Sequence, residues 1–180
     1  RAASAIVTIV ERATRYTLLG HVPGTNHDSA TVRDTVVAAL ADLPPHLRLT
    51  LTWDQGTEMA RHTEIAAALG TTGIYCCDPH SPWQRPSNEN TNGLLRASFP
   101  KGTDLSVHTA NDIALVQLEL NSRPRKVLGW DSPADRLATL PRLMGVATLT
   151  GTRLIADTDR PIDVVLRYDF CTVLRSSRPE

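Results

Sequence analysis

Short apolar runs alternate with longer segments of helical spacing through most of the chain. Residues 5–10 (A-I-V-T-I-V) are β-branched and mostly apolar, which predicts a buried strand. Residues 16–22 predict a second strand, and the polar residues between the two runs suit a hairpin connection. Leucines alternate with polar residues over 47–53, which predicts a third strand, and residues 71–76 fit a fourth.

The segments between and after these strands predict helices. Apolar spacing, caps and helix breakers mark four of them, at 29–43, 59–69, 87–99 and 109–123. The last begins with Thr109, followed three residues later by Asp112, which is the pattern of a capping box. The order β-β-α-β-α-β-α-α predicts an α/β fold, with a mixed sheet flanked by helices.

The regular pattern weakens after about residue 140. We therefore interpret residues 1–140 as one domain and residues 141–180 as a C-terminal tail without an assigned role. The tail has scattered apolar residues and one candidate strand at 162–166.

Composition narrows the functional classes. A net charge of zero removes the simplest argument for nucleic-acid binding, although cations still cluster between Arg123 and Lys126. No apolar run approaches the roughly 20 residues that cross a bilayer, so we expect no membrane association. Three cysteines, two of them adjacent, do not form a disulfide framework, which favours a reducing, intracellular location.

Two carboxylates stand at separate element ends. Asp54 follows the third predicted strand, and Glu89 lies near the start of the third predicted helix in an Asn-rich run. Together they could form an oxygen-ligand site for Mg²⁺, which takes few protein carboxylates and keeps several waters. The alternative is an ordinary turn residue and a solvated helix start. The cluster at 76–80 (C-C-D-P-H) lacks the ligand spacing of a zinc site, so its cysteines are expected to be buried and inert.

Four runs, in this order, resemble the IS-thirty family of bacterial insertion-sequence transposases, which have an integrase-like catalytic core. They are T-W-D-Q-G-T-E-M-A-R-H (52–62), C-D-P-H-S-P-W-Q-R-P-S-N-E-N-T-N-G-L-L-R (77–96), F-P-K-G-T-D-L-S (99–106) and L-N-S-R-P-R-K-V-L-G-W (120–130). Any one of these runs alone would be only suggestive. Four collinear runs make the resemblance specific, and it extends over about residues 5–140.

The resemblance implies a ribonuclease-H-like fold and three acidic residues, Asp-Asp-Glu, that hold two divalent metal ions, Mg²⁺ or Mn²⁺. Asp54 resembles the second aspartate, and Glu89 resembles the glutamate. The implied activity is DNA cleavage and strand transfer by in-line phosphoryl displacement. The implied phosphate contacts are Arg85, Arg96, Lys101, Arg123, Arg125 and Lys126.

The resemblance also implies partners and a location. The partners are the ends of an insertion element and a target DNA, with a homo-oligomer as a further option. The implied location is the bacterial cytoplasm, in association with the nucleoid.

The chain departs from the family pattern at both ends. The first aspartate is expected on a strand ahead of residues 5–10, yet no aspartate occurs before Asp28. The family's amino-terminal DNA-recognition region is also missing, and residues 141–180 resemble nothing in the family. We therefore expect an N-terminally truncated core that lacks its first strand and has no independent strand-transfer activity. The alternatives are a non-catalytic module that binds DNA or a transposase partner, and a fragment that does not fold stably.

Overall fold

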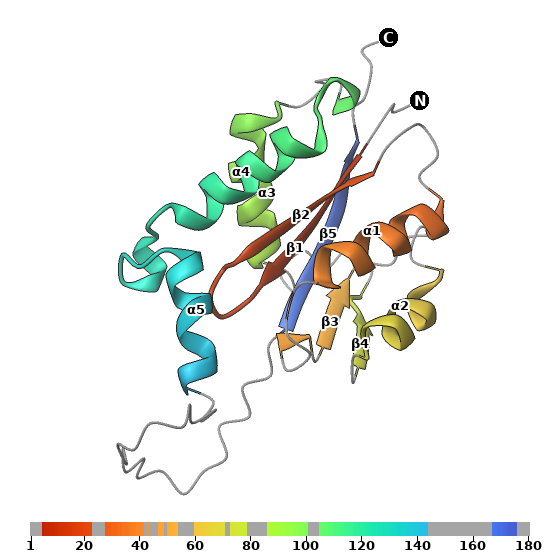
Figure 1. Cartoon of the computed structure of the whole chain (residues 1–180), viewed down its shortest axis with the longest axis horizontal. Coiled ribbons are helices and arrows are strands. Elements are labelled where there is room, and N and C mark those ends of the chain that lie inside the picture. The colour runs from red at the N-terminus through yellow and green to blue at the C-terminus, as the bar shows by residue number, and fades with distance from the viewer. Residues whose placement is uncertain are drawn as a thin grey trace, which may run out of the picture.

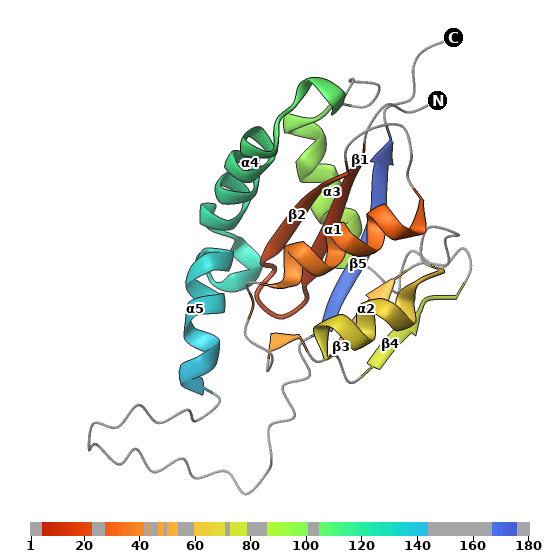
Figure 2. The same ribbon diagram turned by 45° about the vertical axis from the view of Figure 1, so that its right-hand side comes forward.

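A mixed five-stranded sheet forms the centre of the computed structural model, and helices cover both of its faces (Figures 1 and 2). The strand order is β2-β1-β5-β3-β4. The structure describes residues 5–22, 28–41, 43, 47–48, 50–53, 60–70, 73–78, 86–100, 105–143 and 167–175.

The elements predicted from the sequence are present, with ends that differ by a few residues. The strands are β1 (Ala5–Glu11), β2 (Thr17–Val22), β3 (Thr50–Trp53), β4 (Gly73–Cys76) and β5 (Arg167–Arg175). The helices are α1 (Ser29–Ala41), α2 (His62–Leu69), α3 (Pro86–Ser98), α4 (Ala110–Ser122) and α5 (Pro133–Leu143), with short 3₁₀ turns at Leu105–Val107 and Lys126–Leu128. The α/β fold class is thus confirmed, while α5 and β5 were not predicted.

Strand β1 lies inside the sheet, between β2 and β5, and all seven of its residues are buried. It pairs antiparallel with β2 along its length, from Ala5 opposite Val22 to Val10 opposite Thr17. Because successive strand residues face opposite sides, β1 contributes to two separate cores. This double burial explains the nearly continuous apolar run in the sequence.

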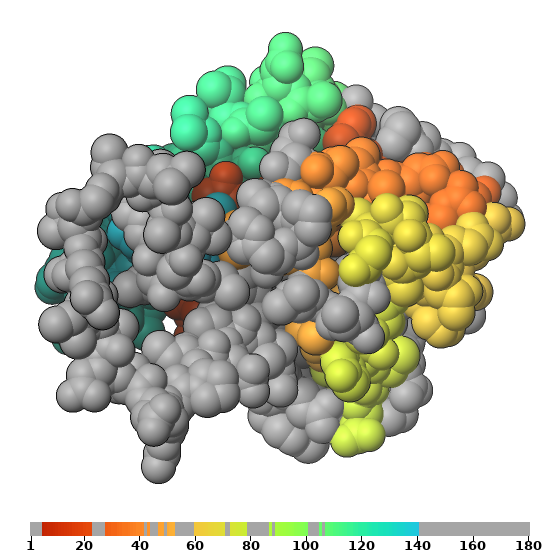
Figure 3. Space-filling model, turned by 60° about the horizontal axis from the view of Figure 1, so that its bottom comes forward, coloured from red at the N-terminus to blue at the C-terminus, as the bar shows by residue number. Residues whose placement is uncertain are grey.

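One core lies beneath α1 and α2. Ala5, Val7 and Ile9 of β1 pack there against a set of buried aliphatic residues: Val32, Val36 and Leu40 of α1, Leu51 of β3, and Ile65 and Leu69 of α2. Arg33 of α1 forms an ion pair with Glu64 of α2, which joins the two helices at the surface. In the space-filling view these helices and β4 make one continuous flank of the molecule (Figure 3).

The other core lies beneath α3 and α4. Ile6 of β1 and Leu19 of β2 belong to it, together with Leu95, Phe99, Leu105, Ile113 and Leu120. Helix α3 packs across β1 and β5, and α4 packs along β2. These contacts place α3 over the middle of the sheet.

Helix α4 also protects the exposed edge of the sheet. Its Asn121 side chain accepts a hydrogen bond from the Thr17 backbone N–H at 2.8 Å and donates one to the Thr17 carbonyl at 2.7 Å. The Gln117 amide oxygen accepts a further bond, at 2.7 Å, from the N–H of Leu19. Backbone groups of β2 that would otherwise lie open at a sheet edge are therefore satisfied by side chains.

Strand β5 comes from the tail, yet it lies between β1 and β3. It runs antiparallel to β1 and parallel to β3, so it joins the β1–β2 hairpin to the β3–β4 pair (Figure 1). The candidate strand at 162–166 lies outside the described residues. The division of the chain at residue 140 stays a prediction, but at least this part of the tail belongs to the sheet.

Candidate functional site

Glu89 lies in the first turn of α3, and its side chain is exposed. The helix is anchored from the opposite side, because Ser87, Thr91 and Leu95 are all buried. The Thr91 hydroxyl donates to the Ser87 carbonyl at 2.9 Å, which closes the first turn. Among the described residues the Glu89 carboxylate has no hydrogen-bond or ionic partner. A rigid helix therefore presents a free carboxylate to solvent.

Asp54 follows directly after Trp53, the last residue of β3, and lies outside the described residues. Its pairing with Glu89, predicted from the sequence, therefore stays a prediction. Within the described part of the chain, no group of three His, Cys, Asp or Glu residues is arranged to hold a metal ion.

Asp169 is a candidate that the sequence interpretation missed. It lies in β5, opposite Val10 of β1 and Thr52 of β3. Val10 has the same parity as Ile6, which packs beneath α3, so the register assigns position 169 to the α3 face of the sheet. Thr52 is two residues before Asp54 in the sequence, and its strand β3 is the neighbour of β5 in the sheet. In the sequence, this candidate is marked by a single acidic residue within the run Y-D-F-C-T-V-L (168–174).

The predicted phosphate-contact residues fall into three groups. Arg96, Arg123 and Lys126 have exposed side chains, and Arg125 is half-buried. Arg85 and Lys101 lie outside the described residues. Of the four described cations, Arg125 is the one that shares a cavity with the start of α3.

That cavity has a volume of about 300 Å³ and lies at the start of α3, although Glu89 itself does not line it. It is lined by Arg15, Ser87, Asn90, Thr91, Arg125 and Val127. Arg15 comes from the β1–β2 connection, where its sequence context looked like an ordinary polar turn. No local signal tied it to α3, so the sequence interpretation did not include it.

Arg125 is held in an unusual environment for a cation. One terminal nitrogen, Nη2, donates to the Leu120 carbonyl at 3.1 Å, while Nε is buried with no hydrogen-bond partner among the described residues. Burial lowers the pKa of the Arg125 guanidinium, and the nearby positive charges of Arg123 and Arg15 lower it further. The side chain still remains cationic at neutral pH, because an arginine pKa starts far above 7.

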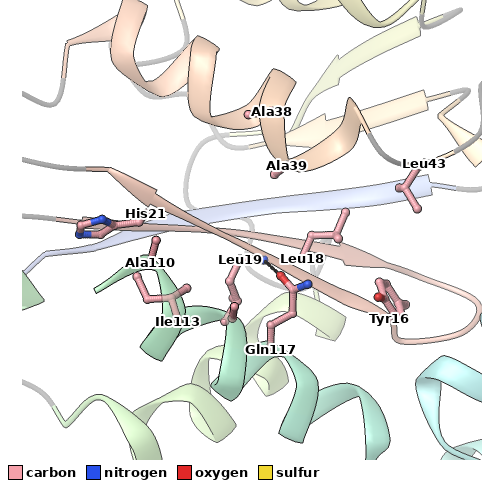
Figure 4. Close-up of a pocket in the computed structure, with 11 residues that line it drawn as sticks. Tyr16, Leu18, Leu19, His21, Ala38, Ala39, Leu43, Ala110, Ile113 and Gln117 are labelled. Atoms are coloured by element: carbon pink, nitrogen blue, oxygen red, sulfur yellow. Dashed lines mark hydrogen bonds between the residues drawn. The ribbon is translucent and has the colours of Figure 1, made fainter. Parts of the chain in front are cut away.

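A second cavity, of about 420 Å³, lies on the β2 edge between α1 and α4 (Figure 4). Most of its lining side chains are apolar, among them Leu18, Leu43 and Ile113. The Gln117 amide oxygen in its wall is already bonded to the Leu19 N–H (Figure 4). No residue of α3 lines this cavity, so it is separate from the Glu89 region.

Two expectations about individual residues need correction. Cys77 is buried as predicted, but its neighbour Cys76 is exposed at the end of the edge strand β4. Trp130 belongs to a residue type that is mostly buried in proteins, yet it is 69% exposed and has a left-handed backbone φ of 73°. Both residues lie where a sheet edge or a surface turn overrides the usual preference of their side chains for burial.

The comparisons with known proteins agree on a family. No protein-family model matches the chain. The transposase for insertion sequence element IS1086 of Cupriavidus metallidurans is 51% identical over 135 residues, which cover 75% of this chain and 39% of that protein. Transposase InsI for IS30A of Escherichia coli is 46% identical over 132 residues, covering 73% and 34%. The chain belongs to the IS30 family of insertion-sequence transposases.

This chain spans only 34% to 39% of those two relatives. The transposase for insertion sequence element IS4351 of Bacteroides fragilis is 38% identical over 143 residues, and this chain covers 43% of its length. The fold agrees with this membership. The catalytic core domain of BIV integrase superposes with a TM-score of 0.56 at 15% identity, covering 78% of this chain and 89% of that one. None of the described helices is long and apolar enough to span a membrane.

Proposed function

We propose that this chain is a segment of a DNA transposase catalytic core that carries out metal-dependent cleavage and strand transfer on DNA. The observation that carries this proposal is the 51% identity to a family transposase over a stretch that includes Glu89's helix. The likeness of the fold to an integrase catalytic core supports it, and in this chain α3 packs across β1 and β5, the second of which pairs with β3.

The donor set suits a hard divalent cation. Asp54 and Glu89 offer carboxylate oxygens, which are the ligands that Mg²⁺ and Mn²⁺ prefer, and they would hold the ions. When bound, such ions activate an attacking oxygen and neutralise charge on the leaving oxygen of a phosphodiester. In the displacement, a new oxygen–phosphorus bond forms as the bond to the departing oxygen breaks. The role of the chain is to hold these carboxylates on rigid elements, so that the geometry of the displacement is reproducible.

Asp169 is proposed as the third carboxylate. With Asp54 and Glu89 alone, a two-metal site would be short of ligands, and the chain is then expected to be inactive. The register of β5 supports the opposite outcome, since position 169 lies beside β3 and on the sheet face that α3 covers. A chain with three acidic positions from three elements would have metal-dependent activity of its own.

The partners follow from the same chemistry. We propose that DNA is the substrate and that the cations Arg85, Arg96, Lys101, Arg123, Arg125 and Lys126 contact its phosphates. Assembly as a homo-oligomer and action in the bacterial cytoplasm at the nucleoid are also proposals, and the family membership is their support.

The direct test is cleavage or joining of insertion-element-end DNA by the purified chain with Mg²⁺ or Mn²⁺. We predict activity that requires the metal and that falls at least about a hundredfold in Glu89→Gln, which keeps the shape of the side chain and removes its charge. Glu119→Gln, on the exposed side of α4, is the matched control and should retain activity. Cleavage that survives Glu89→Gln would rule out the proposed site.

A second candidate function is a module that binds DNA without cleaving it. The cavity lined by Arg15 and Arg125 favours it, because cationic groups give affinity for DNA whether or not a metal is held. Salt-dependent DNA binding without any metal-dependent cleavage would support this second function over the first.

A further inference from the structure

The β1–β2 connection is built to fix Arg15. The buried Glu11 carboxylate accepts hydrogen bonds from two backbone N–H groups, that of Ala13 at 2.9 Å and that of Thr14 at 2.5 Å. The Glu11 backbone also bonds to Arg15 and Tyr16, at 2.8 Å each. Arg15 is thereby held with a left-handed φ of 63°, a conformation uncommon for residues other than glycine.

The turn after α4 fixes Arg125 in a similar way. The Arg125 N–H donates to the Asp131 carbonyl at 3.1 Å, and its own carbonyl accepts the N–H groups of Leu128 at 2.9 Å and Trp130 at 3.0 Å. Trp130 has the other left-handed φ among the described non-glycine residues. Both arginines of the cavity are thus set by turns that carry backbone strain, and such strain often accompanies functional sites.

Arg15 and Arg125 both line this cavity. Among the described residues, neither Arg15 nor Arg125 forms an ion pair with a carboxylate. Like charges held together in a half-buried site repel each other, and the buried Nε of Arg125 has a donor to offer. An anion with several acceptor oxygens would reduce this repulsion and would provide an acceptor for the unpaired donor.

The rest of the lining suits the same kind of ligand. Ser87 and Asn90 of α3 add a hydroxyl and an amide to the two guanidinium groups. Arginine pairs well with phosphate because its planar group can donate two parallel hydrogen bonds. Asn90 follows Glu89 in the first turn of α3, so a phosphate in this cavity would lie at the same end of the helix as the exposed carboxylate, but on the opposite side of the helix.

We propose that this cavity binds one phosphate group of the DNA backbone and so holds the strand at the end of α3 that carries Glu89. This rests on the proposed function only in taking DNA as the ligand, since the site itself needs no metal. Arg15 is accordingly a DNA-binding residue, and Arg125 acts with it as a pair, whereas Arg96, Arg123 and Lys126 contribute from the open surface.

The test is DNA binding in EDTA, measured by fluorescence anisotropy of a labelled duplex over a series of KCl concentrations. Arg15→Gly and Arg125→Gln are each expected to weaken binding several-fold at low salt and to reduce the salt slope by about one. The double variant should weaken DNA binding by a factor smaller than the product of the two single factors, because both arginines contact one phosphate. Arg61→Gln, a surface arginine near α2, is the matched control and should change little.

Folding and ligand source are controlled separately. Arg15→Gly should melt at or above the wild-type temperature, because glycine adopts the left-handed φ without strain. Inorganic phosphate, at matched ionic strength, should raise the melting temperature of the wild type and not that of Arg15→Gly. A phosphate effect that needs Arg15, combined with unchanged DNA affinity, would mean a free-anion site and would overturn the assignment to DNA.

Failure of this inference is distinguishable from failure of the proposed function. If both arginine variants bind DNA like Arg61→Gln, the phosphate site is wrong, whatever the metal-dependent activity. If Glu89→Gln leaves cleavage unchanged while Arg15→Gly weakens DNA binding in EDTA, the catalytic proposal fails and the phosphate site stands.

Discussion

Three acidic residues show how the surroundings of a carboxylate decide its role. Glu11 is fully buried and receives hydrogen bonds from the hairpin backbone, so it shapes the connection that carries Arg15. Asp112 closes the capping box at the start of α4. Glu89 is exposed and has no partner among the described residues, which leaves its oxygens available for a ligand.

Asp112 makes stability depend on pH in a specific window. Hydrogen bonds from the Thr109 backbone and hydroxyl lower the pKa of the Asp112 carboxyl below its usual 3.8. Its stabilising effect is therefore fully present above about pH 4 and is lost as the pH falls through the lowered pKa. We expect Asp112→Asn to lower the urea midpoint at pH 7 and to differ less from the wild type near pH 2. A difference of the same size at both pH values would contradict this assignment.

At the scale of elements, two contacts hold the sheet together across long sequence distances. The amide groups of α4 satisfy the outer backbone of β2, and β5 joins the two halves of the sheet. Both depend on segments that are remote from each other in the chain. Their loss should therefore affect the whole fold and not only one element.

Asn121→Ala tests the contact between α4 and the sheet edge. The substitution leaves the buried backbone N–H and C=O of Thr17 without their side-chain partner. We expect the free energy of unfolding to fall by about 2 kcal/mol. Leu118→Ala, at an exposed position on the same helix, should stay within about 0.5 kcal/mol of the wild type. Equal effects of the two substitutions in urea unfolding would argue against an edge-capping role.

Cys171→Pro tests whether β5 is part of the sheet in solution. Position 171 pairs with Thr8 of β1, and proline removes the backbone donor of a central strand. We predict a lower melting temperature and loss of cooperative unfolding by circular dichroism. Ser177→Pro, beyond the described end of β5, provides the comparison and should melt like the wild type. An unchanged melting curve for Cys171→Pro would mean that β1 and β3 do not depend on this strand.

Across the whole molecule, local patterns predicted the elements better than they predicted the site. The pattern that predicts β1 lies within residues 5–10, and the pattern that predicts the start of α4 lies between Thr109 and Asp112. Both could be predicted because each pattern is local. The insertion of β5 could not, because its partners lie far earlier in the chain and strand pairing has no local code.

The cationic cavity escaped prediction for a related reason. Arg15 owes its conformation to hydrogen bonds of the buried Glu11, and it meets Arg125 only once β1, α3 and the turn after α4 are packed together. The sequence showed both arginines but not their proximity. Glu89 differs, because its exposed position near the start of a helix could be read from its Asn-rich surroundings.

We propose that the carboxylates of Asp54, Glu89 and Asp169 form one metal site, and titration calorimetry with Mn²⁺ measures the affinity of that site. We predict that the wild type binds Mn²⁺ and that Asp54→Asn, Glu89→Gln and Asp169→Asn each weaken the affinity at least about tenfold, while Glu119→Gln does not. If Asp169→Asn binds Mn²⁺ as tightly as Glu119→Gln, β5 contributes no ligand and the three-carboxylate site is wrong.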